Sequence, residues 1–357
     1  MLPEIKITKT ENPKAKYTDE SSLGFGKVFT DHMFIIEYTE GKGWHDARIE
    51  PYHPFSIDPA ATVLHYGQEI FEGLKAYRRD DGHIQLFRPE ENAQRMNNSA
   101  ERVCMPTLDV EYQVKAMKML VEVEKDWVPH KSGTSLYLRP TMIGLGNALG
   151  VHPAKHYYYY IICAASGSYY KNGMAPVRIR IEDYYVRAVR GGIGAAKTGG
   201  NYAASLLAGE LAAKDGFDQV LWLDGRENKY VQEVGAMNMF FVMDGKLFTA
   251  PIEDCILPGI TRKSIMQLAE DKGIEVVVRP IEVAELFEAY EQGRLTEAFG
   301  TGTAAVISPV GKLRYKDDVM TINNNEIGPL SQKLYDTITG LQWGKIEDTF
   351  GFVVNVD

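Results

Sequence analysis

The stretch Arg190-Gly-Gly-Ile-Gly-Ala-Ala-Lys-Thr-Gly-Gly-Asn-Tyr-Ala-Ala-Ser205 sets one lysine, Lys197, among five glycines and small residues just before a helical pattern. A backbone with so few side chains allows a ligand to approach it closely. A lysine amine condenses with an aldehyde only after it loses its proton, which requires burial or a cationic neighbour. The alternative is a solvated lysine in a flexible glycine loop, and this segment alone leaves both interpretations open.

The composition is that of a globular protein that acts on a small molecule. The chain has 357 residues, 45% of them hydrophobic and 24% charged, which is enough for two domains with hydrophobic cores. Its formal net charge of -9 disfavours nucleic acid or an acidic membrane as a partner. Cys104, Cys163 and Cys255 are widely spaced and lack clustered histidines, so we expect no disulfide framework, no metal site and a cytoplasmic location.

The pattern along the chain predicts a mixed α/β fold with a boundary near its middle. The longest apolar run, 157–165, is too short to cross a bilayer and indicates a buried strand. The turn-rich segment Gly167–Pro176 follows it. We therefore expect a first domain over 1–167, a linker over 168–176 and a second domain over 177–357. Helices and strands mix in the first part, and strands dominate the second.

Apolar spacing predicts the individual elements. Asp81-Gly82 and Asp244-Gly245 are hairpin signals, and strands are expected at 75–79, 84–88, 220–223, 239–243, 246–249, 275–279 and 304–307. Helices are expected near 93–103, 114–121 and 327–341, from Tyr202 after an Asn201 cap, and from a Thr261 cap to a stop at Gly273. The helix from about Tyr202 is expected to carry one apolar face, made of Ala204, Leu207, Ala208, Leu211 and Ala212.

Three further segments carry residues that suit a charged ligand. Leu257-Pro-Gly-Ile-Thr-Arg262 opens a helix, and Phe299-Gly-Thr-Gly-Thr-Ala-Ala305 is a glycine and threonine turn; hydroxyl and N–H donors at both suit a phosphate. Glu233 lies in strand-like sequence, where a buried carboxylate needs a cationic partner. Taken singly, each has an ordinary structural explanation: a capped helix, a common turn and an exposed glutamate.

A lysine amine, a carboxylate for a ring nitrogen and turns for a phosphate are together what pyridoxal phosphate requires of a protein. At these residues the chain resembles the branched-chain-amino-acid aminotransferases, which are fold-type IV pyridoxal phosphate enzymes, from about Gly24 to Val310. The matching segments are Phe25-Gly-Lys-Val-Phe-Thr-Asp-His-Met33, Leu64-His-Tyr-Gly-Gln-Glu-Ile-Phe-Glu-Gly-Leu-Lys-Ala76, Leu136-Tyr-Leu-Arg-Pro-Thr141, Lys197-Thr-Gly-Gly-Asn-Tyr202, Glu233-Val-Gly-Ala-Met-Asn238, Leu257-Pro-Gly-Ile-Thr-Arg262 and Phe299-Gly-Thr-Gly-Thr303.

The resemblance implies a small α+β domain, a larger β-rich barrel-like domain and specific roles for cofactor-binding residues. It implies that Lys197 forms the Schiff base with pyridoxal phosphate and moves the proton, and that Glu233 keeps the pyridine nitrogen protonated. Tyr202 is implied as the hydrogen-bond partner of the ring oxygen. The implied phosphate ligands are Arg95, Ile260, Thr261 and Thr303.

The resemblance also implies a homodimer that exchanges amino groups between leucine, isoleucine or valine and 2-oxoglutarate in a ping-pong cycle. Arg139 would receive the glutamate side-chain carboxylate. The implied pocket consists of Phe25, Phe71, Tyr137, Ala236 and Ala304, with Tyr66, Leu149 and Val151 from a second subunit; Tyr157–Tyr160 are expected to pack in the core. Animal members carry a CxxC where this chain has Ala305 and Ser308, and Ala236 replaces a threonine of some members, which leaves the substrate preference open.

Three alternatives stay open. A D-amino-acid aminotransferase and an aminodeoxychorismate lyase share the fold type, but both are expected to be shorter and to lack the Tyr137-Leu-Arg139 arrangement. A non-catalytic protein could hold a phosphorylated metabolite on the two glycine and threonine turns without using Lys197.

Overall fold

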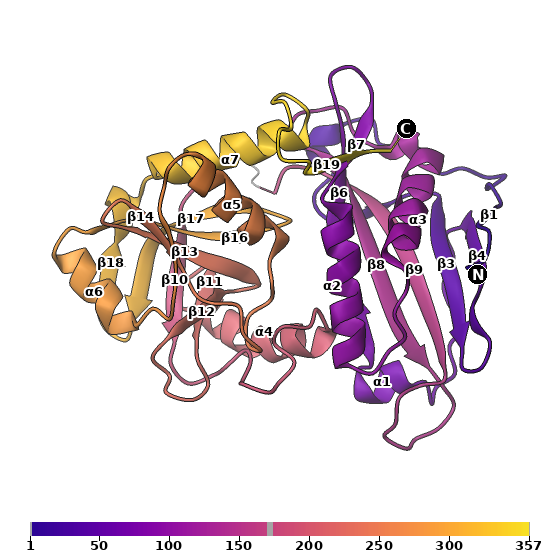
Figure 1. Cartoon of the computed structure of the whole chain (residues 1–357), viewed down its shortest axis with the longest axis horizontal. Helices are drawn as coiled ribbons and strands as arrows, with labels where there is room; N and C mark the ends of the chain where they lie inside the picture. The colour runs from indigo at the N-terminus through magenta and orange to yellow at the C-terminus, as the bar shows by residue number, and fades with distance from the viewer. Residues whose placement is uncertain (1, 170–173, 357) are drawn as a thin grey trace. The chain divides into compact units, whose positions relative to one another are not determined.

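The computed structural model describes residues 2–169 and 174–356, which divide into two compact units (Figure 1). Unit 1 comprises Met1–Tyr169, Ala196–Gly199 and Gly340–Asp357, and unit 2 comprises Tyr170–Ala195 and Gly200–Thr339. Residues 170–173 of the predicted linker lie outside the described residues. The segment that carries Lys197 groups with unit 1, although the sequence analysis assigned it to the second domain. The predicted boundaries of the folding domains stay a prediction.

The described residues of unit 1 form a 10-stranded sheet with helices. The strands are β1 (Lys6–Ile7), β2 (Val28–Phe29), β3 (His32–Thr39), β4 (Gly43–Pro51), β5 (Glu69–Phe71), β6 (Leu74–Arg78), β7 (Ile84–Phe87), β8 (Ser135–Leu145), β9 (His156–Ser166) and β19 (Val353–Asn355), and the helices are η1 (Glu20–Ser22), α1 (Thr62–Tyr66), α2 (Pro89–Arg102), α3 (Val110–Val123) and η2 (Lys125–Trp127). The strand order is β1-β4-β3-β9-β8-β6-β7-β19, with β2 paired to β9 and β5 to β8. The hairpin predicted at Asp81-Gly82 is confirmed by the pairing of β6 with β7.

The core of unit 1 lies where α2 and α3 cover one face of this sheet (Figure 1). Met96 and Ala100 of α2 and Met117 of α3 pack with strand residues there. Side chains of a strand alternate between the faces of a sheet, so β9 buries Tyr157 and Tyr159 in this core. Tyr158 and Tyr160 are only half-buried. The expectation that all four tyrosines pack in the core is therefore wrong for alternate positions.

The described residues of unit 2 form a nine-stranded sheet that closes on itself. Its strands are β10 (Val177–Glu182), β11 (Gln219–Leu223), β12 (Val231–Val234), β13 (Met237–Met243), β14 (Lys246–Thr249), β15 (Val276–Val278), β16 (Leu295–Gly302), β17 (Val306–Tyr315) and β18 (Asp318–Thr321). The order is β12-β11-β10-β17-β16-β13-β14-β15, with β18 on β17. Because β12 pairs with both β11 and β13, the path closes into a barrel, as the resemblance implied.

The helices that follow in the chain are α4 (Gly199–Lys214), α5 (Ile260–Asp271), α6 (Val283–Glu291), η3 (Ile322–Asn325) and α7 (Pro329–Gln342). Leu286 and Ala289 of α6 pack with the barrel strands in the core of unit 2. The hairpin predicted at Asp244-Gly245 is confirmed by the pairing of β13 with β14. No helix within the described residues is long and apolar enough to cross a membrane.

Two details of the predicted helices are wrong. The helix expected from Tyr202 begins at Gly199, and the Asn201 amide donates to the Ile193 carbonyl at 2.8 Å instead of capping the helix. Helix α5 is capped by Gly259 in an extended conformation, which places Thr261 inside the first turn. Of the apolar face predicted for α4, Ala208 is buried and Leu207 is 55% exposed. The left-handed stop at Gly273 is confirmed by its φ of +73°.

Candidate functional site

The segment that carries Lys197 is held against β5 in unit 1 by backbone and side-chain hydrogen bonds. The Phe71 N–H donates to the Lys197 carbonyl at 3.0 Å, and the Lys197 N–H donates to the buried Ser99 hydroxyl at 2.9 Å. The Thr198 hydroxyl donates to the Glu69 carbonyl at 2.7 Å. These contacts on both sides of its Cα fix the backbone of Lys197, so its side chain leaves the chain in a defined direction.

The amine of Lys197 has an unusually low affinity for a proton. Burial and the nearby positive charge of Arg95 lower its pKa to about 8, and the Glu72 carboxylate partly opposes this. The Nζ atom lies 4.9 Å from the centroid of the Phe71 ring, an apolar surface that does not solvate a charge as water does. About half of the amine is neutral at pH 8, and a neutral amine is the form that attacks an aldehyde.

A buried ion pair lies beside this amine. Arg95 on α2 donates from Nε and Nη2 to the two Glu72 oxygens at 2.7 and 2.8 Å, and Asn92 donates to the same carboxylate at 2.7 Å. The Glu72 side chain is 0% exposed; burial alone would raise its pKa, but the charges of Arg95 and Lys197 hold the pKa below its usual value. From spacing alone Arg95 would be an exposed helix arginine, and Glu72 is a residue that the sequence analysis missed.

Aromatic rings and one guanidinium occupy the same region of unit 1. The Phe25 and Tyr137 rings meet edge to face with their centroids 4.9 Å apart. The Arg139 guanidinium lies 4.8 Å from the Phe71 centroid and donates to the Tyr137 hydroxyl at 3.0 Å. The buried Arg139 Nε has no hydrogen-bond partner among the described residues. This region therefore combines apolar side chains with a guanidinium that can donate hydrogen bonds to a carboxylate of a ligand.

The residues implied to act in a second subunit lie on the surface of unit 1. Tyr66 ends α1 and donates its hydroxyl to the Leu149 carbonyl. Leu149 is largely exposed and Val151 is 83% exposed, both in the loop between β8 and β9. An exposed pair of aliphatic side chains on one loop suits contact with another protein surface.

Glu233 lies on β12 in unit 2 and is almost completely buried. Its carboxylate accepts hydrogen bonds from the Asn238 amide at 3.1 Å and the Leu257 N–H at 3.3 Å, and it forms an ion pair with Arg187 Nε at 2.8 Å. Glu233 is thus buried, as its strand-like sequence suggested, and its cationic partner is Arg187, which was not predicted from the sequence. A carboxylate beside a buried guanidinium keeps its negative charge, which a protonated ring nitrogen requires.

The other expected site residues of unit 2 lie at turns and helix starts. Ile260 and Thr261 form the first turn of α5, where helix N–H groups are available to an anion. Thr303 and Ala304 form the turn between β16 and β17, and Ala236 lies in the turn between β12 and β13. Tyr202 is a half-buried residue of α4. This set suits a phosphate-bearing ligand.

Two features at the end of β16 and the turn after it suggest that a ligand binds there. Val306, the residue after the turn, has a φ of +61°, a conformation that a β-branched residue adopts only under strain. The buried Thr301 hydroxyl has no hydrogen-bond partner among the described residues. A buried donor without a partner costs free energy unless a ligand or water satisfies it. Thr301 was not predicted: the sequence pattern named neither threonine of this turn, and the resemblance implied Thr303.

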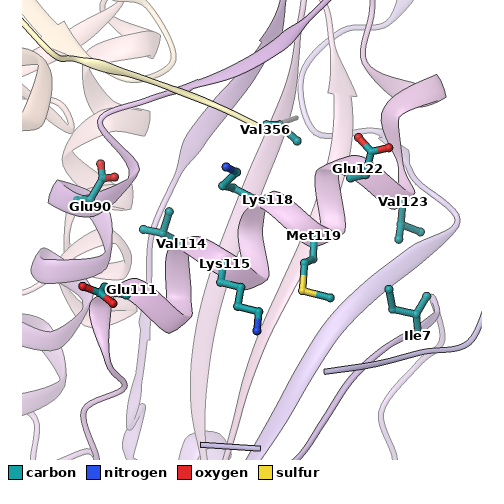
Figure 2. Close-up of a pocket in the computed structure, with 10 residues that line it drawn as sticks. All are labelled: Ile7, Glu90, Glu111, Val114, Lys115, Lys118, Met119, Glu122, Val123 and Val356. Carbon is teal, nitrogen blue, oxygen red and sulfur yellow. The ribbon is translucent and has the colours of Figure 1, made fainter. Parts of the chain in front are cut away.

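A groove of about 640 Å³ lies along α3, but it lacks the expected chemistry (Figure 2). Ile7, Met119 and Val123 supply its apolar wall, and Lys115 and Lys118 lie on the same helix. None of the residues expected at the active site lines it. We therefore do not assign the reaction to this groove.

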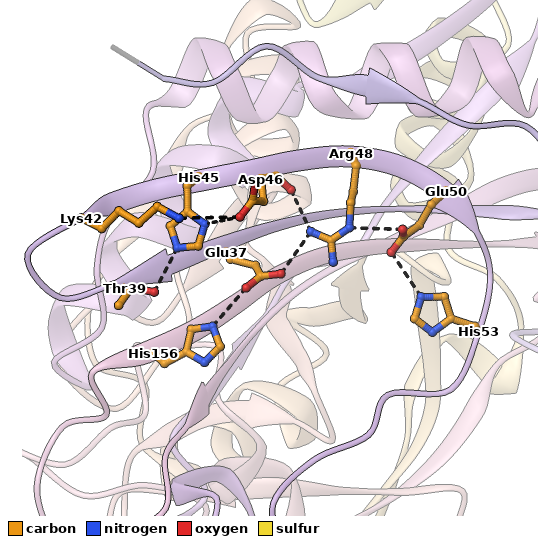
Figure 3. Close-up of polar contacts among 9 residues, drawn as sticks. All are labelled: Glu37, Thr39, Lys42, His45, Asp46, Arg48, Glu50, His53 and His156. Carbon is orange, nitrogen blue, oxygen red and sulfur yellow. Dashed lines mark hydrogen bonds and ion pairs between the residues drawn. The ribbon is translucent and has the colours of Figure 1, made fainter.

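A chain of charged side chains on β3, β4 and β9 of unit 1 is a second cluster without the expected chemistry (Figure 3). Arg48 joins Glu37 and Glu50 at 3.2 Å each, and His156 and His53 contact the same two carboxylates. The carboxylates are thus already paired with cations or imidazoles. Within 2–169 and 174–356, no group of three or more histidine, cysteine, aspartate and glutamate side chains could hold a metal ion.

Known proteins that are similar to this chain are aminotransferases. Residues 69–313 match the family model described as amino-transferase class IV. A probable branched-chain-amino-acid aminotransferase of Staphylococcus epidermidis is 55% identical over 357 residues, covering 100% of this chain and 99% of the relative. Branched-chain-amino-acid aminotransferase 2 of Bacillus subtilis is 51% identical over 352 residues, covering 99% and 96%.

A solved structure shows the same fold. The T.th. branched-chain amino acid aminotransferase, complexed with N-(5'-phosphopyridoxyl)-L-glutamate, has a TM-score of 0.72 and 28% identity, covering 90% of this chain and 98% of that chain. These similarities confirm the resemblance stated from the sequence, the mixed α/β fold and pyridoxal phosphate as the cofactor.

Proposed function

Because the chain belongs to the class IV aminotransferase family, we propose that it transfers the amino group of leucine, isoleucine or valine to 2-oxoglutarate. The observation that carries the proposal is the buried Lys197 amine on a segment that is flanked by glycines and bound to β5; burial and Arg95 also lower its pKa to about 8. The relatives named above as branched-chain-amino-acid aminotransferases support the substrate class.

The residues present fit the cofactor. Unit 1 offers a partly neutral amine and a buried guanidinium, and unit 2 offers a buried carboxylate, a helix start and a buried hydroxyl without a described partner. When bound, pyridoxal phosphate supplies an aldehyde for the amino group and a ring that withdraws electrons from the substrate Cα. Arg95, Ile260, Thr261 and Thr303 would hold its phosphate.

Each remaining residue has one task in the proposed mechanism. Lys197 Nζ would move a proton between the substrate Cα and the C4′ carbon of the cofactor, as base and then as acid in each half of the cycle, which an amine with a pKa near the working pH does efficiently. The Glu233 carboxylate, which is paired with Arg187, would keep a proton on the ring nitrogen. The Tyr202 hydroxyl would hydrogen-bond the ring oxygen.

The substrate side chain would contact Phe25, Phe71, Tyr137, Ala236 and Ala304. Moving an apolar side chain from water to such a surface has no desolvation cost. The side-chain carboxylate of glutamate does have one and needs a cation, which Arg139 supplies. The buried Arg139 Nε, which has no described partner, leaves a donor for that carboxylate.

The proposal includes a cytoplasmic homodimer in which Tyr66, Leu149 and Val151 of one copy complete the site of the other. Their exposure supports it, as does that of Leu206 and Leu207 on α4. A second copy would remove these apolar side chains from water.

Single-turnover measurement tests the proposed reaction. Protein loaded with pyridoxal phosphate and mixed with leucine, without a 2-oxo acid, is expected to release about one 4-methyl-2-oxopentanoate per site and then stop, because the amino group stays on the protein. Adding 2-oxoglutarate is expected to restore turnover with formation of glutamate, and Lys197→Ala to show neither. Turnover of D-leucine but not L-leucine would contradict the proposal.

A further inference from the structure

Glu69 is a carboxylate beside Lys197 to which neither the sequence pattern nor the resemblance assigns a role. It starts β5, two residues before Phe71, so both side chains point to the same face of the sheet. The Lys197 amine and the Arg139 guanidinium lie 4.9 and 4.8 Å from the centroid of the Phe71 ring on that face. Glu69 therefore belongs to the same surface as the amine and the guanidinium.

The Glu69 side chain is fixed in place. Its carboxylate accepts the N–H of Gly199, the second residue after Lys197, and its backbone carbonyl accepts the Thr198 hydroxyl at 2.7 Å. A Cβ atom at position 199 would collide with this carboxylate, which explains the need for glycine there. The negative charge is thus held at one location by the segment that carries the amine.

Arg139 is close enough to stabilise the charged form of this carboxylate. Burial raises the pKa of Glu69 above its usual value, and the Gly199 N–H and the Arg139 charge oppose part of that rise. Burial raises the pKa of the nearby Tyr160 phenol, and Glu69 and Arg139 add smaller effects of opposite sign, Glu69 raising this pKa and Arg139 lowering it. Glu69 is therefore a counter-charge close to the guanidinium that is proposed to receive a second carboxylate.

We propose that Glu69 is a specificity-determining residue: its anchored negative charge beside Arg139 weakens the binding of dicarboxylate substrates relative to substrates with apolar side chains. The inference rests on the proposed function, since it assigns a role at the same substrate site. With an apolar side chain bound, Glu69 balances the charge of Arg139. With a dicarboxylate bound, the second carboxylate lies near the Glu69 charge and the two repel each other.

The test measures binding of two unreactive acids by calorimetry to the full-length protein loaded with pyridoxal phosphate. Glutarate represents the dicarboxylates and 4-methylvalerate the apolar side chains; neither carries an amino group, so no turnover occurs. Glu69→Gln keeps the size and an oxygen acceptor for the Gly199 N–H but removes the charge. We expect it to bind glutarate about three- to tenfold more tightly, with the affinity for 4-methylvalerate changed less than about twofold.

Two further variants separate charge from shape. Glu69→Asp keeps the charge and is expected to retain the wild-type ratio of the two affinities, and the exposed Glu111→Gln on α3 is a control for a lost surface charge. The role of Glu69 would be overturned if Glu69→Gln left the ratio of the glutarate and 4-methylvalerate affinities unchanged, or if Glu69→Asp shifted this ratio as much as Glu69→Gln does. Either result would leave the proposed function intact. Failure of the wild-type protein to bind either acid would overturn both.

Discussion

Two lysines of unit 1, Lys197 and Lys75, have a pKa lowered to about 8 by burial, so a low pKa does not by itself select the reactive amine. Lys75 lies on β6 between Leu74 and Ala76, with no glycine beside it. Lys197 is followed by Thr198 and two glycines, and its backbone is bound to β5. The glycines and those contacts, not the pKa, single out Lys197 for a ligand that must approach closely.

The first prediction concerns the titration of Lys197. In cofactor-free protein, acetylation of the peptide that contains Lys197 is expected to reach half its maximal rate near pH 8, because burial and Arg95 favour the neutral amine. A free lysine peptide, with a pKa of about 10.4, serves as the reference in the same mixture. Mass spectrometry across pH 6 to 11, in a range where the protein stays folded, provides the measurement; coincident curves for protein and peptide would contradict the prediction.

The second prediction concerns Glu72. Its charge raises the pKa of Lys197, so Glu72→Gln is expected to move the same titration curve to lower pH. The substitution also leaves Arg95 buried without its carboxylate, which is expected to lower the free energy of unfolding by about 3 kcal/mol. Urea unfolding measures the second effect, and Glu111→Gln is the control for both. A shift of the Lys197 curve to higher pH would show that Glu72 does not act through its charge.

At the scale of elements, Glu297 on β16 stabilises the start of α7. Its buried carboxylate accepts the N–H groups of Leu330 and Ser331 at 2.9 and 2.8 Å and the Ser331 hydroxyl at 2.7 Å. These N–H groups belong to the first turn of the helix, where no helical carbonyl is available to them. The carboxylate also interacts favourably with the positive end of the helix dipole.

The third prediction follows from this contact. Glu297→Ala leaves three donors without their acceptor and is expected to lower the free energy of unfolding by about 2 kcal/mol. The exposed Glu291→Ala on α6 is expected to change it by less than about 0.5 kcal/mol. Denaturant unfolding of both variants is the measurement, and equal stabilities would show that solvent replaces the carboxylate.

The elements were predictable where the signal is local. The turns at Asp81-Gly82 and Asp244-Gly245 join paired strands as expected, since an Asp-Gly pair favours the tight turn by its own backbone preferences. The start of α5 was predicted at Thr261 but is set by Gly259, which adopts the extended cap conformation itself. Leu207 lies on the predicted apolar face of α4 and is exposed, because helical spacing does not tell whether another element covers that face.

In the candidate site, too, local sequence signals predict single residues but not contacts between residues that are distant in the chain. The glycines around Lys197 made it a candidate, and the other motifs and the resemblance were needed to choose between a reactive and a solvated lysine. The ion pairs Arg95–Glu72 and Arg187–Glu233 join separate elements, and no spacing rule predicts them. Arg95 was found only through resemblance, and Glu72 and Arg187 were not found at all, since a buried pair becomes visible only when the fold brings its members together.

The fourth prediction tests the proposed dimer. If Val151 serves the site of a second subunit, Val151→Asp and Lys197→Ala should each be nearly inactive, yet refolding them together should restore activity. A mixed dimer has one site with an intact lysine and an intact loop, so an equimolar mixture is expected to reach about a quarter of wild-type activity. Each variant refolded with itself is the control. No recovery in mixtures that contain mixed dimers would show that the loop acts within its own subunit.

The central claim is that the Lys197 amine is joined covalently to pyridoxal phosphate in the resting protein. Borohydride reduction of the loaded protein, followed by peptide mass mapping, tests this directly because reduction makes the bond permanent. We expect the added mass of the reduced cofactor on the peptide with Lys197, and none on Lys75. Modification of Lys75 instead, or bound cofactor without any modified lysine, would contradict it.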